Sequence, residues 1–367
     1  MEKVRGRLGF GCMRLPMNGE EVDYIEFSKM IDFFLDNGFN YFDTAHMYVG
    51  GKSETALRDC LVKRHDRESY ILTNKLSAPY FKTNEEIIPF FESQLKLCGV
   101  EYFDFYLMHS QDKEIFEKFK KCRAYETASE LKKQGKIKHL GISFHDTADV
   151  LDEILSEYPE IEVVQIQFNY SDFEDKNVQS KLCYEVCKKH NKPIIVMEPV
   201  RGGSLAHSLP DEALKVFSDL NGGSPASYAL RFVADFPEIF MILSGMGNMD
   251  MISENVGLFK DLKPLEATEL DAISKVCDII KKQPTIPCTA CCYCVEGCPK
   301  NILIPDLFGC LSERMRWKNK DVSWSYNFAI KDHGKASECI ECGKCEKACP
   351  QHLPIRELLK TVAKTFE

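Results

Sequence analysis

The chain has 367 residues, a formal net charge of −9 and 17 cysteines, and its 44% of hydrophobic residues are enough for a buried core. This length favours one large domain with a smaller one, and the acidic balance argues against nucleic acid as a partner. No apolar run approaches the ~20 residues of a membrane span, and the first residues lack the apolar segment of a secretory signal. We therefore expect a cytoplasmic protein without a membrane partner.

Short apolar segments rich in β-branched or aromatic residues recur along the chain, and amphipathic stretches separate them. The expected strands are 8–15, 40–45, 70–75, 103–110, 138–143, 163–169, 193–199 and 240–245. Helical spacing and end signals predict helices at 26–38, 84–99 and 224–232. Eight such alternations predict an α/β fold, a (β/α)8 TIM barrel over residues 1–282. The alternative, a doubly wound sheet, needs a dinucleotide fingerprint after the first strand, and the glycines of 6–11 have the wrong spacing.

Polar residues follow or end three successive expected strands. Asp43 and Tyr48 come at and after the second strand, Lys75 ends the third and His109 ends the fourth. In a barrel of this kind, the active site lies at the carboxyl ends of the strands. An ammonium beside a phenol stabilises the phenolate, and a histidine can donate a hydrogen bond to a carbonyl oxygen. Reduction of a carbonyl, with a proton from Tyr48, fits these groups. A purely structural ion pair is the alternative for Asp43 and Lys75.

Three segments carry a family resemblance. FDTAHMYVGGKSE (42–54), ILTNKLS (71–77) and YLMHS (106–110) resemble the motifs of the aldo-keto reductase family, and the resemblance extends over roughly residues 5–280. It implies that Asp43, Tyr48, Lys75 and His109 form a catalytic tetrad with Tyr48 as general acid. It also implies that a nicotinamide cofactor, NADP(H) or NAD(H), lies across the barrel mouth.

The resemblance further implies a set of cofactor contacts at the loops of the barrel mouth. These residues are Gly11, Met13, Ser143, Gln165, Pro199, Arg201, Gly202, Gly203, Leu205, Ser244, Gly245, Glu254 and Asn255. Met197 stands where the family usually has an aromatic residue, and 244–255 contains no Lys or Arg to meet a 2′-phosphate. The choice between NADPH and NADH therefore stays open, and a flavin is the alternative cofactor.

The C-terminal part contains two cysteine runs with the same spacing. The runs are Cys288, Cys291, Cys294 and Cys298, and then Cys339, Cys342, Cys345 and Cys349, each followed by a proline. This C-x2-C-x2-C-x3-C-P pattern is typical of proteins that bind two [4Fe–4S] clusters, in which the fourth cysteine of each run ligates the other cluster. The expected sets are Cys288, Cys291, Cys294 and Cys349 for one cluster and Cys339, Cys342, Cys345 and Cys298 for the other. Zinc is the alternative metal, and Cys292 fits neither spacing.

The cluster segment is expected to form a small, mostly helical, two-cluster ferredoxin-like domain over residues 283–367. Helices are expected at 305–317 and 354–364, and Trp317 and Trp324 are expected to pack its core. From Gln283 onward, 12 Lys and Arg stand against 10 Asp and Glu, so an acidic electron donor such as a ferredoxin or flavodoxin is a candidate partner. The clusters either relay electrons or only stabilise a segment too small to fold alone.

Three functions follow from these features. The leading one is an oxidoreductase that reduces a carbonyl of a small organic substrate with a nicotinamide cofactor, and the combination resembles ferredoxin-fused aldo-keto reductases. The second is a reductase of a carbonyl or conjugated alkene that receives electrons from ferredoxin or a flavin. The third is a nucleotide-binding redox sensor without catalytic activity, which the presence of Asp43, Tyr48, Lys75 and His109 disfavours.

Overall fold

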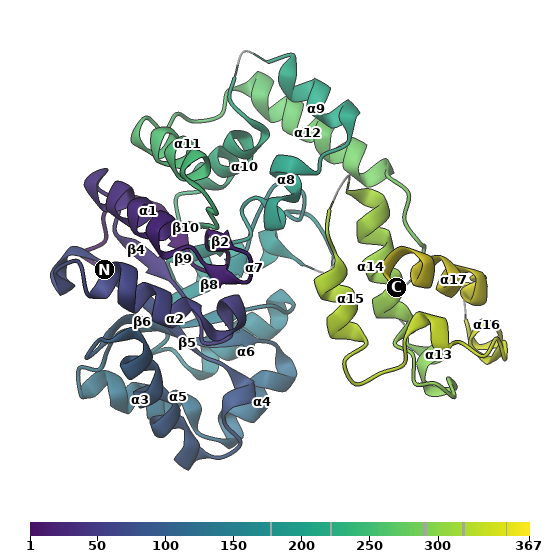
Figure 1. Ribbon diagram of the computed structural model, residues 1–367, viewed down its shortest axis with the longest axis horizontal. Helices are drawn as coiled ribbons and strands as arrows, with labels where there is room; N and C mark the ends of the chain where they lie inside the picture. Colours follow the sequence, from purple (N-terminus) through teal and green to yellow (C-terminus); the bar gives the residue numbers. More distant parts are fainter. Residues whose placement is uncertain (177, 221, 289–291, 318–319, 350) are drawn as a thin grey trace. The chain divides into compact units, whose positions relative to one another are not determined.

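The computed structural model describes residues 1–367 except 177, 221, 289–291, 318–319 and 350. The chain divides into two compact units, one formed by 1–202 with 226–267 and the other by 203–225 with 268–367. Figure 1 shows the barrel strands in the first unit and the cluster segment in the second. The second unit thus includes a segment of the expected barrel range, so the domain boundary at 282 stays a prediction.

The first unit contains a closed barrel of eight parallel strands, as predicted. Its strands are β1 (Leu8–Gly11), β4 (Tyr41–Asp43), β5 (Ile71–Leu76), β6 (Phe103–Gln111), β7 (Ile137–Phe144), β8 (Val163–Gln167), β9 (Ile194–Met197) and β10 (Ile239–Ser244). Each strand pairs with the next in the chain, and β10 closes on β1. Two short strands that the sequence did not predict, β2 (Met17–Asn18) and β3 (Glu21–Val22), form an antiparallel hairpin after β1.

Helices surround the barrel (Figure 1). They are α1 (Tyr24–Asp36), α2 (Ser53–Leu57), α3 (Ile87–Cys98), α4 (Lys113–Lys121), α5 (Ala124–Lys133), α6 (Ala148–Glu157), α7 (Ser180–Lys189), α10 (Pro225–Ala234) and α11 (Met249–Lys260). Local sequence explains their ends: Asp23 accepts hydrogen bonds from the first N–H groups of α1, and Gly99 caps α3 in the left-handed conformation with φ 73°. Each helix buries one apolar face, as Phe27, Met30 and Phe34 do on α1.

Tightly packed side chains fill the barrel interior. Residues that face inward from several strands include Tyr41, Ile71, Phe105, Leu107, Val163, Ile195, Met241 and Leu243. Gly141 on β7 shows how close this packing is, because a Cβ added there would lie 2.5 Å from Val163 and 2.6 Å from Leu107. A barrel interior packed in this way fixes the strand ends, and with them the side chains that those ends carry.

The second unit is helical in the part that the structure describes. Its helices are α8 (Ser204–His207), α9 (Asp211–Ser218), α12 (Ala267–Lys282), α13 (Tyr293–Glu296), α14 (Ile304–Arg316), α15 (Ser323–Ala329), α16 (Lys344–Ala348) and α17 (Ile355–Phe366). The expected helices at 305–317 and 354–364 correspond to α14 and α17. These two helices pack together through apolar residues such as Leu307, Phe308, Leu359 and Val362.

The two tryptophans of the cluster segment differ in burial. Trp317 is fully buried, as expected, but Trp324 is 71% exposed, so the expectation that both pack the core is wrong for Trp324. The reason is helical spacing. Trp324 stacks on Phe328, four residues further along α15, and both lie on the face of the helix away from the buried residues Tyr326 and Ala329.

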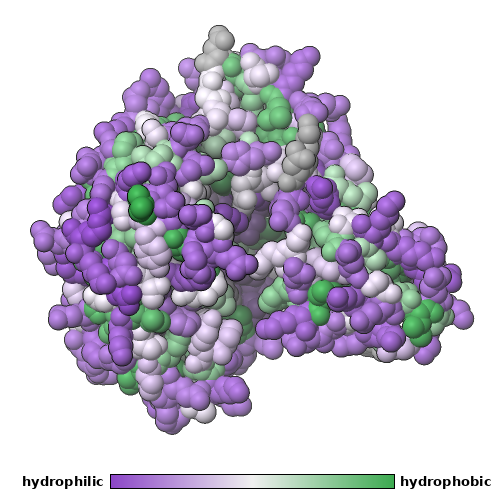
Figure 2. All heavy atoms as spheres, viewed as in Figure 1, coloured by the Kyte–Doolittle hydropathy of each residue, from purple (hydrophilic) through white to green (hydrophobic). Residues whose placement is uncertain are grey.

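Hydrophilic residues cover most of the face of the molecule shown in Figure 2, and apolar residues form only scattered patches there. Among the residues that the structure describes, no helix is long and apolar enough to cross a membrane.

Candidate active site and cluster cavities

Parallel strands bring the four predicted catalytic side chains to one end of the barrel. Asp43 is the last residue of β4, Lys75 is the penultimate residue of β5, and His109 lies near the end of β6. Tyr48 begins a 3-10 turn, Tyr48–Gly51, in the connection that follows β4. The carboxyl ends of parallel barrel strands share one rim, which is why residues 32 and 34 positions apart in the chain become neighbours.

Lys75 is the centre of the site. Its side chain is fully buried, and its ammonium donates to Asp43 Oδ1 at 2.5 Å and to the backbone carbonyl of Thr44 at 2.8 Å. Burial lowers the pKa of Lys75, but Asp43 and Tyr48 raise it by more, so the net shift is upward. Burial raises the pKa of Asp43, and Lys75 only partly offsets this effect. Lys75 therefore stays cationic at neutral pH.

Tyr48 lies beside this ammonium. Lys75 Nζ is 4.9 Å from the centre of the Tyr48 ring, and the Tyr48 and His109 rings meet edge to face with centroids 6.1 Å apart. Lys75 lowers the pKa of Tyr48, as the sequence led us to expect, but burial has the larger effect and the net shift is upward from 10.0. Tyr48 consequently keeps its proton at neutral pH, when it could act as an acid.

His109 is buried and electrically neutral. Burial is the main reason that its pKa lies well below 6.5, and Lys75 and His145 lower it further. Its Nδ1 lies 2.6 Å from the hydroxyl of Ser77. If this hydroxyl donates to Nδ1, the ring proton is on Nε2, which can then donate to a substrate oxygen. Ser77 was not among the residues predicted from the sequence, although its place directly after β5, two residues beyond Lys75, was a usable signal.

Two predicted cofactor residues, Ser143 and Gln165, are buried and adjacent near the ends of β7 and β8. Gln165 Oε1 has no hydrogen-bond partner among the described residues. A buried acceptor without a partner costs free energy, and the amide N–H of a nicotinamide carboxamide would satisfy it. This pair of residues thus fits the predicted cofactor.

The other predicted cofactor contacts differ in their burial and in the unit to which they belong. Gly11 and Ser244 lie at the ends of the paired strands β1 and β10, and a Cβ on Gly11 would come 3.3 Å from the Ser244 carbonyl. Ser244 and Asn255 are buried and hydrogen-bonded at 3.0 Å. The remaining first-unit residues are Pro199, which is buried, and Met13, Gly202, Gly245 and Glu254, which are exposed. Gly203 and Leu205 belong to the second unit, where Leu205 is buried.

Arg201, predicted to contact phosphate, forms an ion pair with Asp172. Its Nε donates to Asp172 Oδ1 at 3.0 Å, and the same carboxylate accepts from Gln167 and Asn169. Asp172 therefore ties the loop after β8 to the loop after β9. A second cation, Arg14, was not identified from sequence. Its Nη2 lies 3.3 Å from where a Cβ on Gly202 would stand. The position of Arg14 in the loop directly after β1 was the sequence signal that could have identified it.

Cysteines of the second unit line two cavities. The first is lined by Cys288, Cys292, Cys294 and Cys349 together with apolar residues such as Ile304 and Phe308. The second is lined by Cys298, Cys339, Cys342 and Cys345. Cys349 thus joins the first run and Cys298 joins the second run, in the crossed arrangement expected for two clusters. Cys291 lies outside the described residues, and Cys292, expected to be a bystander, borders the first cavity.

The geometry of these cysteines suits a cluster better than a single ion. Within the described part of the chain, no three His, Cys, Asp or Glu side chains converge closely enough to hold one metal ion. Zinc would need four ligands about 2.0–2.3 Å from one point. The cysteines instead line two spaces that apolar residues border, with Cys294 and Cys345 buried and Cys342 exposed.

Comparison with known proteins agrees with both parts of this description. Residues 7–278, more than half of the chain, match the aldo/keto reductase family. The chain belongs to this family. It is therefore an oxidoreductase, and its barrel is the barrel of the aldo-keto reductases. Residues 287–353 match the 4Fe-4S dicluster domain, so an iron–sulfur domain of the dicluster type follows the reductase.

The similar proteins match the reductase part. Dihydrodiol dehydrogenase 3 of Bos taurus is 25% identical over 296 residues, which cover 73% of this chain and 87% of that protein. Protein REDOX 2 of Catharanthus roseus is 25% identical and covers 73% of this chain and 85% of its own length. Among solved structures, the holo form of an aldo-keto reductase from Bacillus halodurans has a TM-score of 0.59 at 24% identity, covering 74% of this chain and 91% of that one. This likeness bears on the fold alone.

Proposed function

We propose that the barrel reduces the carbonyl group of a small organic substrate and uses NADP(H) or NAD(H) as the hydride donor. The observation that carries this proposal is the contact set of the buried Lys75 ammonium, 2.5 Å from Asp43 and 4.9 Å from the centre of the Tyr48 ring. The neutral His109 next to Tyr48 completes a group of side chains suited to an oxygen that gains negative charge.

Each of the four side chains has one role in this proposal. A bound nicotinamide supplies a hydride to the carbonyl carbon. Tyr48 donates its phenolic proton to the carbonyl oxygen, so the product is an alcohol and the tyrosine is left as phenolate. The Lys75 ammonium stabilises that phenolate, and Asp43 holds the ammonium in place. His109 donates a hydrogen bond from Nε2 to the same oxygen, with Ser77 fixing the ring.

The residues proposed to hold the cofactor come from several strand ends. Ser143 and Gln165 would bind the carboxamide, and the Gln165 Oε1 atom without a partner supports this assignment. Arg14 and Arg201, in the loops after β1 and β9, would meet the diphosphate. The absence of Lys and Arg from residues 244–255 leaves NADPH and NADH as alternatives, and a bound flavin would replace both.

For the second unit we propose two [4Fe–4S] clusters. One would be bound by Cys288, Cys291, Cys294 and Cys349, and the other by Cys298, Cys339, Cys342 and Cys345. The two cavities, each lined by the described members of one of these sets, support the proposal. When bound, the clusters supply one-electron transfer. They either relay electrons from a ferredoxin or flavodoxin or stabilise the unit.

The acid role is tested by Tyr48→Phe in anaerobically purified protein, assayed with a panel of aldehydes and ketones and with NADPH and NADH. We expect kcat to fall about 10²- to 10⁴-fold, the range for loss of a general acid. Tyr70→Phe is the matched control, because Tyr70 is buried at the opposite end of the barrel strands and its hydroxyl has no partner among the described residues. Unchanged carbonyl reduction by Tyr48→Phe would refute the proposal.

The clusters are tested by the iron and sulfide content and the visible spectrum of the anaerobic protein. Two clusters correspond to about eight irons per chain. If NADPH, NADH or a reduced ferredoxin bleaches the cluster absorbance, the clusters exchange electrons. If none of them does and the iron content is complete, the clusters have a structural role. A flavin spectrum in the same sample would replace the nicotinamide proposal by the flavin alternative.

A further inference from the structure

We propose that Glu54, the second residue of α2, is a positioning residue that fixes the Tyr48 loop relative to the strand carrying Lys75. The inference rests on the proposed carbonyl reduction, since it concerns the geometry of the same acid and the same ammonium. Glu54 touches neither of them directly, so any effect on the reaction must pass through the groups that it binds.

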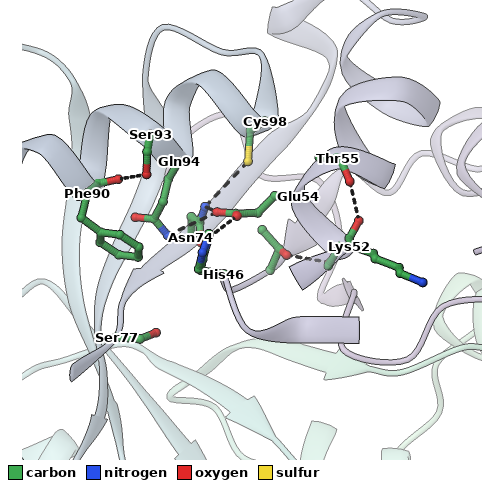
Figure 3. Close-up of polar contacts among 12 residues, drawn as sticks. His46, Lys52, Glu54, Thr55, Asn74, Ser77, Phe90, Ser93, Gln94 and Cys98 are labelled. Carbon is green, nitrogen blue, oxygen red and sulfur yellow. Dashed lines mark hydrogen bonds and ion pairs between the residues drawn. The ribbon is translucent and has the colours of Figure 1, made fainter. Parts of the chain in front are cut away.

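Glu54 is a fully buried carboxylate with three donors around it. Its Oε1 accepts from Asn74 Nδ2 at 2.7 Å and from Gln94 Nε2 at 3.3 Å, and its Oε2 lies 2.6 Å from His46 Nδ1. Figure 3 shows these side chains converging on Glu54 from three different segments. A carboxylate without water is tolerated only when hydrogen bonds of this kind replace its hydration, so the four groups act as one unit.

One side of this unit holds Lys75. Asn74 directly precedes Lys75 on β5, and its Oδ1 accepts from the Lys75 backbone N–H at 2.8 Å. Gln94 of α3 donates to the Lys75 backbone carbonyl at 3.0 Å and accepts from Tyr106 at 2.5 Å. Both backbone polar groups of Lys75 are therefore bound by side chains that Glu54 orients.

The other side holds the loop that carries Tyr48. His46 stands two residues before Tyr48, and its ring packs edge to face on Tyr80 and Phe90, at centroid distances of 4.6 and 5.2 Å. The contact with Glu54 holds the His46 ring in the orientation in which it also packs on Tyr80 and Phe90. In addition to their direct contact, Lys75 and Tyr48 are thus connected through the Glu54 carboxylate.

The residue before Glu54 reinforces the same connection. Ser53 Oγ is 2.7 Å from Thr44 Oγ1 and donates to the Cys12 carbonyl at 2.9 Å. The backbone carbonyl of Thr44 in turn accepts from the Lys75 ammonium. The first two residues of α2 therefore bind the ends of β4 and β5 as well as the Tyr48 loop.

A buried carboxylate at the other end of β5 offers a matched control. Asp104 is 7% exposed and accepts from Arg67 at 2.6 Å and from the Leu72 backbone N–H at 2.8 Å. It binds the same strand as the Glu54 unit, but near the amino end, away from the site. Loss of Asp104 should lower stability without moving the tetrad.

The experiment compares Glu54→Met, Glu54→Gln and Asp104→Asn in anaerobic, iron-replete protein. A misplacement of about 1 Å can cost about 100-fold in rate, so we expect Glu54→Met to lower kcat about 100-fold, with KM and the NADP(H) dissociation constant near wild type. Glu54→Gln keeps the acceptor for Asn74 and Gln94 and should restore most of this loss. Asp104→Asn should lower the melting temperature and leave kcat unchanged. With NADPH deuterated at the transferred position, the isotope effect on kcat should rise in Glu54→Met only.

Two results would overturn the inference: a wild-type kcat and isotope effect in Glu54→Met, or equal losses in Glu54→Gln and Glu54→Met. If Glu54→Met fails to fold, His46→Leu takes its place, because this partly exposed side chain connects only the loop side. We then expect a smaller loss of kcat, and an unchanged kcat would overturn the inference. A normal rate in Tyr48→Phe would instead refute the proposed function, so the two failures are distinguishable.

Discussion

The barrel and the cluster unit differ in what surrounds their reactive side chains. In the barrel, the Lys75 ammonium has a carboxylate and a carbonyl within 2.8 Å, and each partner belongs to the same chain. In the cluster unit, cysteines line two cavities together with apolar residues such as Ile304. The Lys75 ammonium thus has its partners within the chain, whereas the cysteines of the two runs line spaces in which we propose that iron–sulfur clusters bind.

Cysteine itself is used differently in the two regions. Burial raises the pKa of Cys12 and Cys98 well above 9.0, and that of Cys187 rises for the same reason. These barrel thiols stay protonated and pack as small apolar side chains. The described cysteines of the two runs line cavities instead, and metal ligation requires their thiolate form.

Iron removal should produce the largest difference in protease resistance between the barrel and the cluster unit. We expect chelation under anaerobic conditions to make residues 283–367 sensitive to protease while the barrel stays resistant, because only the former has a core built around the metal group. Cys345→Ser should lose about four irons per chain. Cys310→Ser is the control, since Cys310 is buried in the same unit but lines neither cavity. A cluster unit that stays resistant to protease without iron would contradict the comparison.

The barrel should instead be sensitive to loss of one partner in its ion pair. Lys75→Met leaves the Asp43 carboxylate buried without its cation, which costs about 3–5 kcal/mol of unfolding free energy. The double variant Asp43→Asn, Lys75→Met removes both charges and should recover a large part of that loss. Denaturant unfolding of the three proteins measures both effects. Equal stability of the single and double variants would show that the pair is not coupled.

The two tryptophans separate packing from metal binding in the cluster unit. Trp317→Ala should cost about 3–5 kcal/mol because the side chain is fully buried. Trp324→Ala removes a side chain that is 71% exposed and should change stability by less than about 0.5 kcal/mol. Thermal unfolding of the iron-loaded protein tests this difference. If the two variants melt alike, the clusters rather than the side chains determine the stability of the unit.

The smallest expected effect is a pH dependence of barrel stability. The pKa of His109 lies well below 6.5 in the folded protein, mainly through burial, and that of His145 is lowered too. Below pH 6.5 the unfolded chain therefore binds protons that the folded chain does not, and stability falls with decreasing pH by at most about 1.4 kcal/mol per pH unit for each histidine. His109→Asn should reduce this slope, as measured by denaturant unfolding between pH 7 and 5. An unchanged slope would contradict a neutral, buried His109.

The sequence predicted the fold well because each barrel strand is a short, almost continuous apolar run, as in β5 and β6. It also predicted which polar residues meet, since Asp43, Lys75 and His109 end adjacent strands. The Glu54 unit was not predictable in this way. Residues 54, 74 and 94 are 20 positions apart, a spacing that corresponds to no helix or strand period, and they meet only because α2 and α3 pack over the end of β5.

Other differences also have tertiary causes. Asp172, the partner of Arg201, lies in the loop after a different strand, so no sequence pattern links the two residues. The net direction of the Tyr48 pKa depends on burial, which outweighs a charge that the sequence did reveal. The exposure of Trp324 depends on which face of α15 the unit covers.

The crossed lining of the two cavities has a consequence for biosynthesis. Cys349 lines the first cavity, and Cys298 from the first cysteine run lines the second cavity together with Cys339, Cys342 and Cys345. Neither cavity can therefore form while the ribosome is still translating residues 300–348. Loading of the two proposed clusters would therefore wait for nearly all of this stretch to be translated, and both sites would become available at almost the same time.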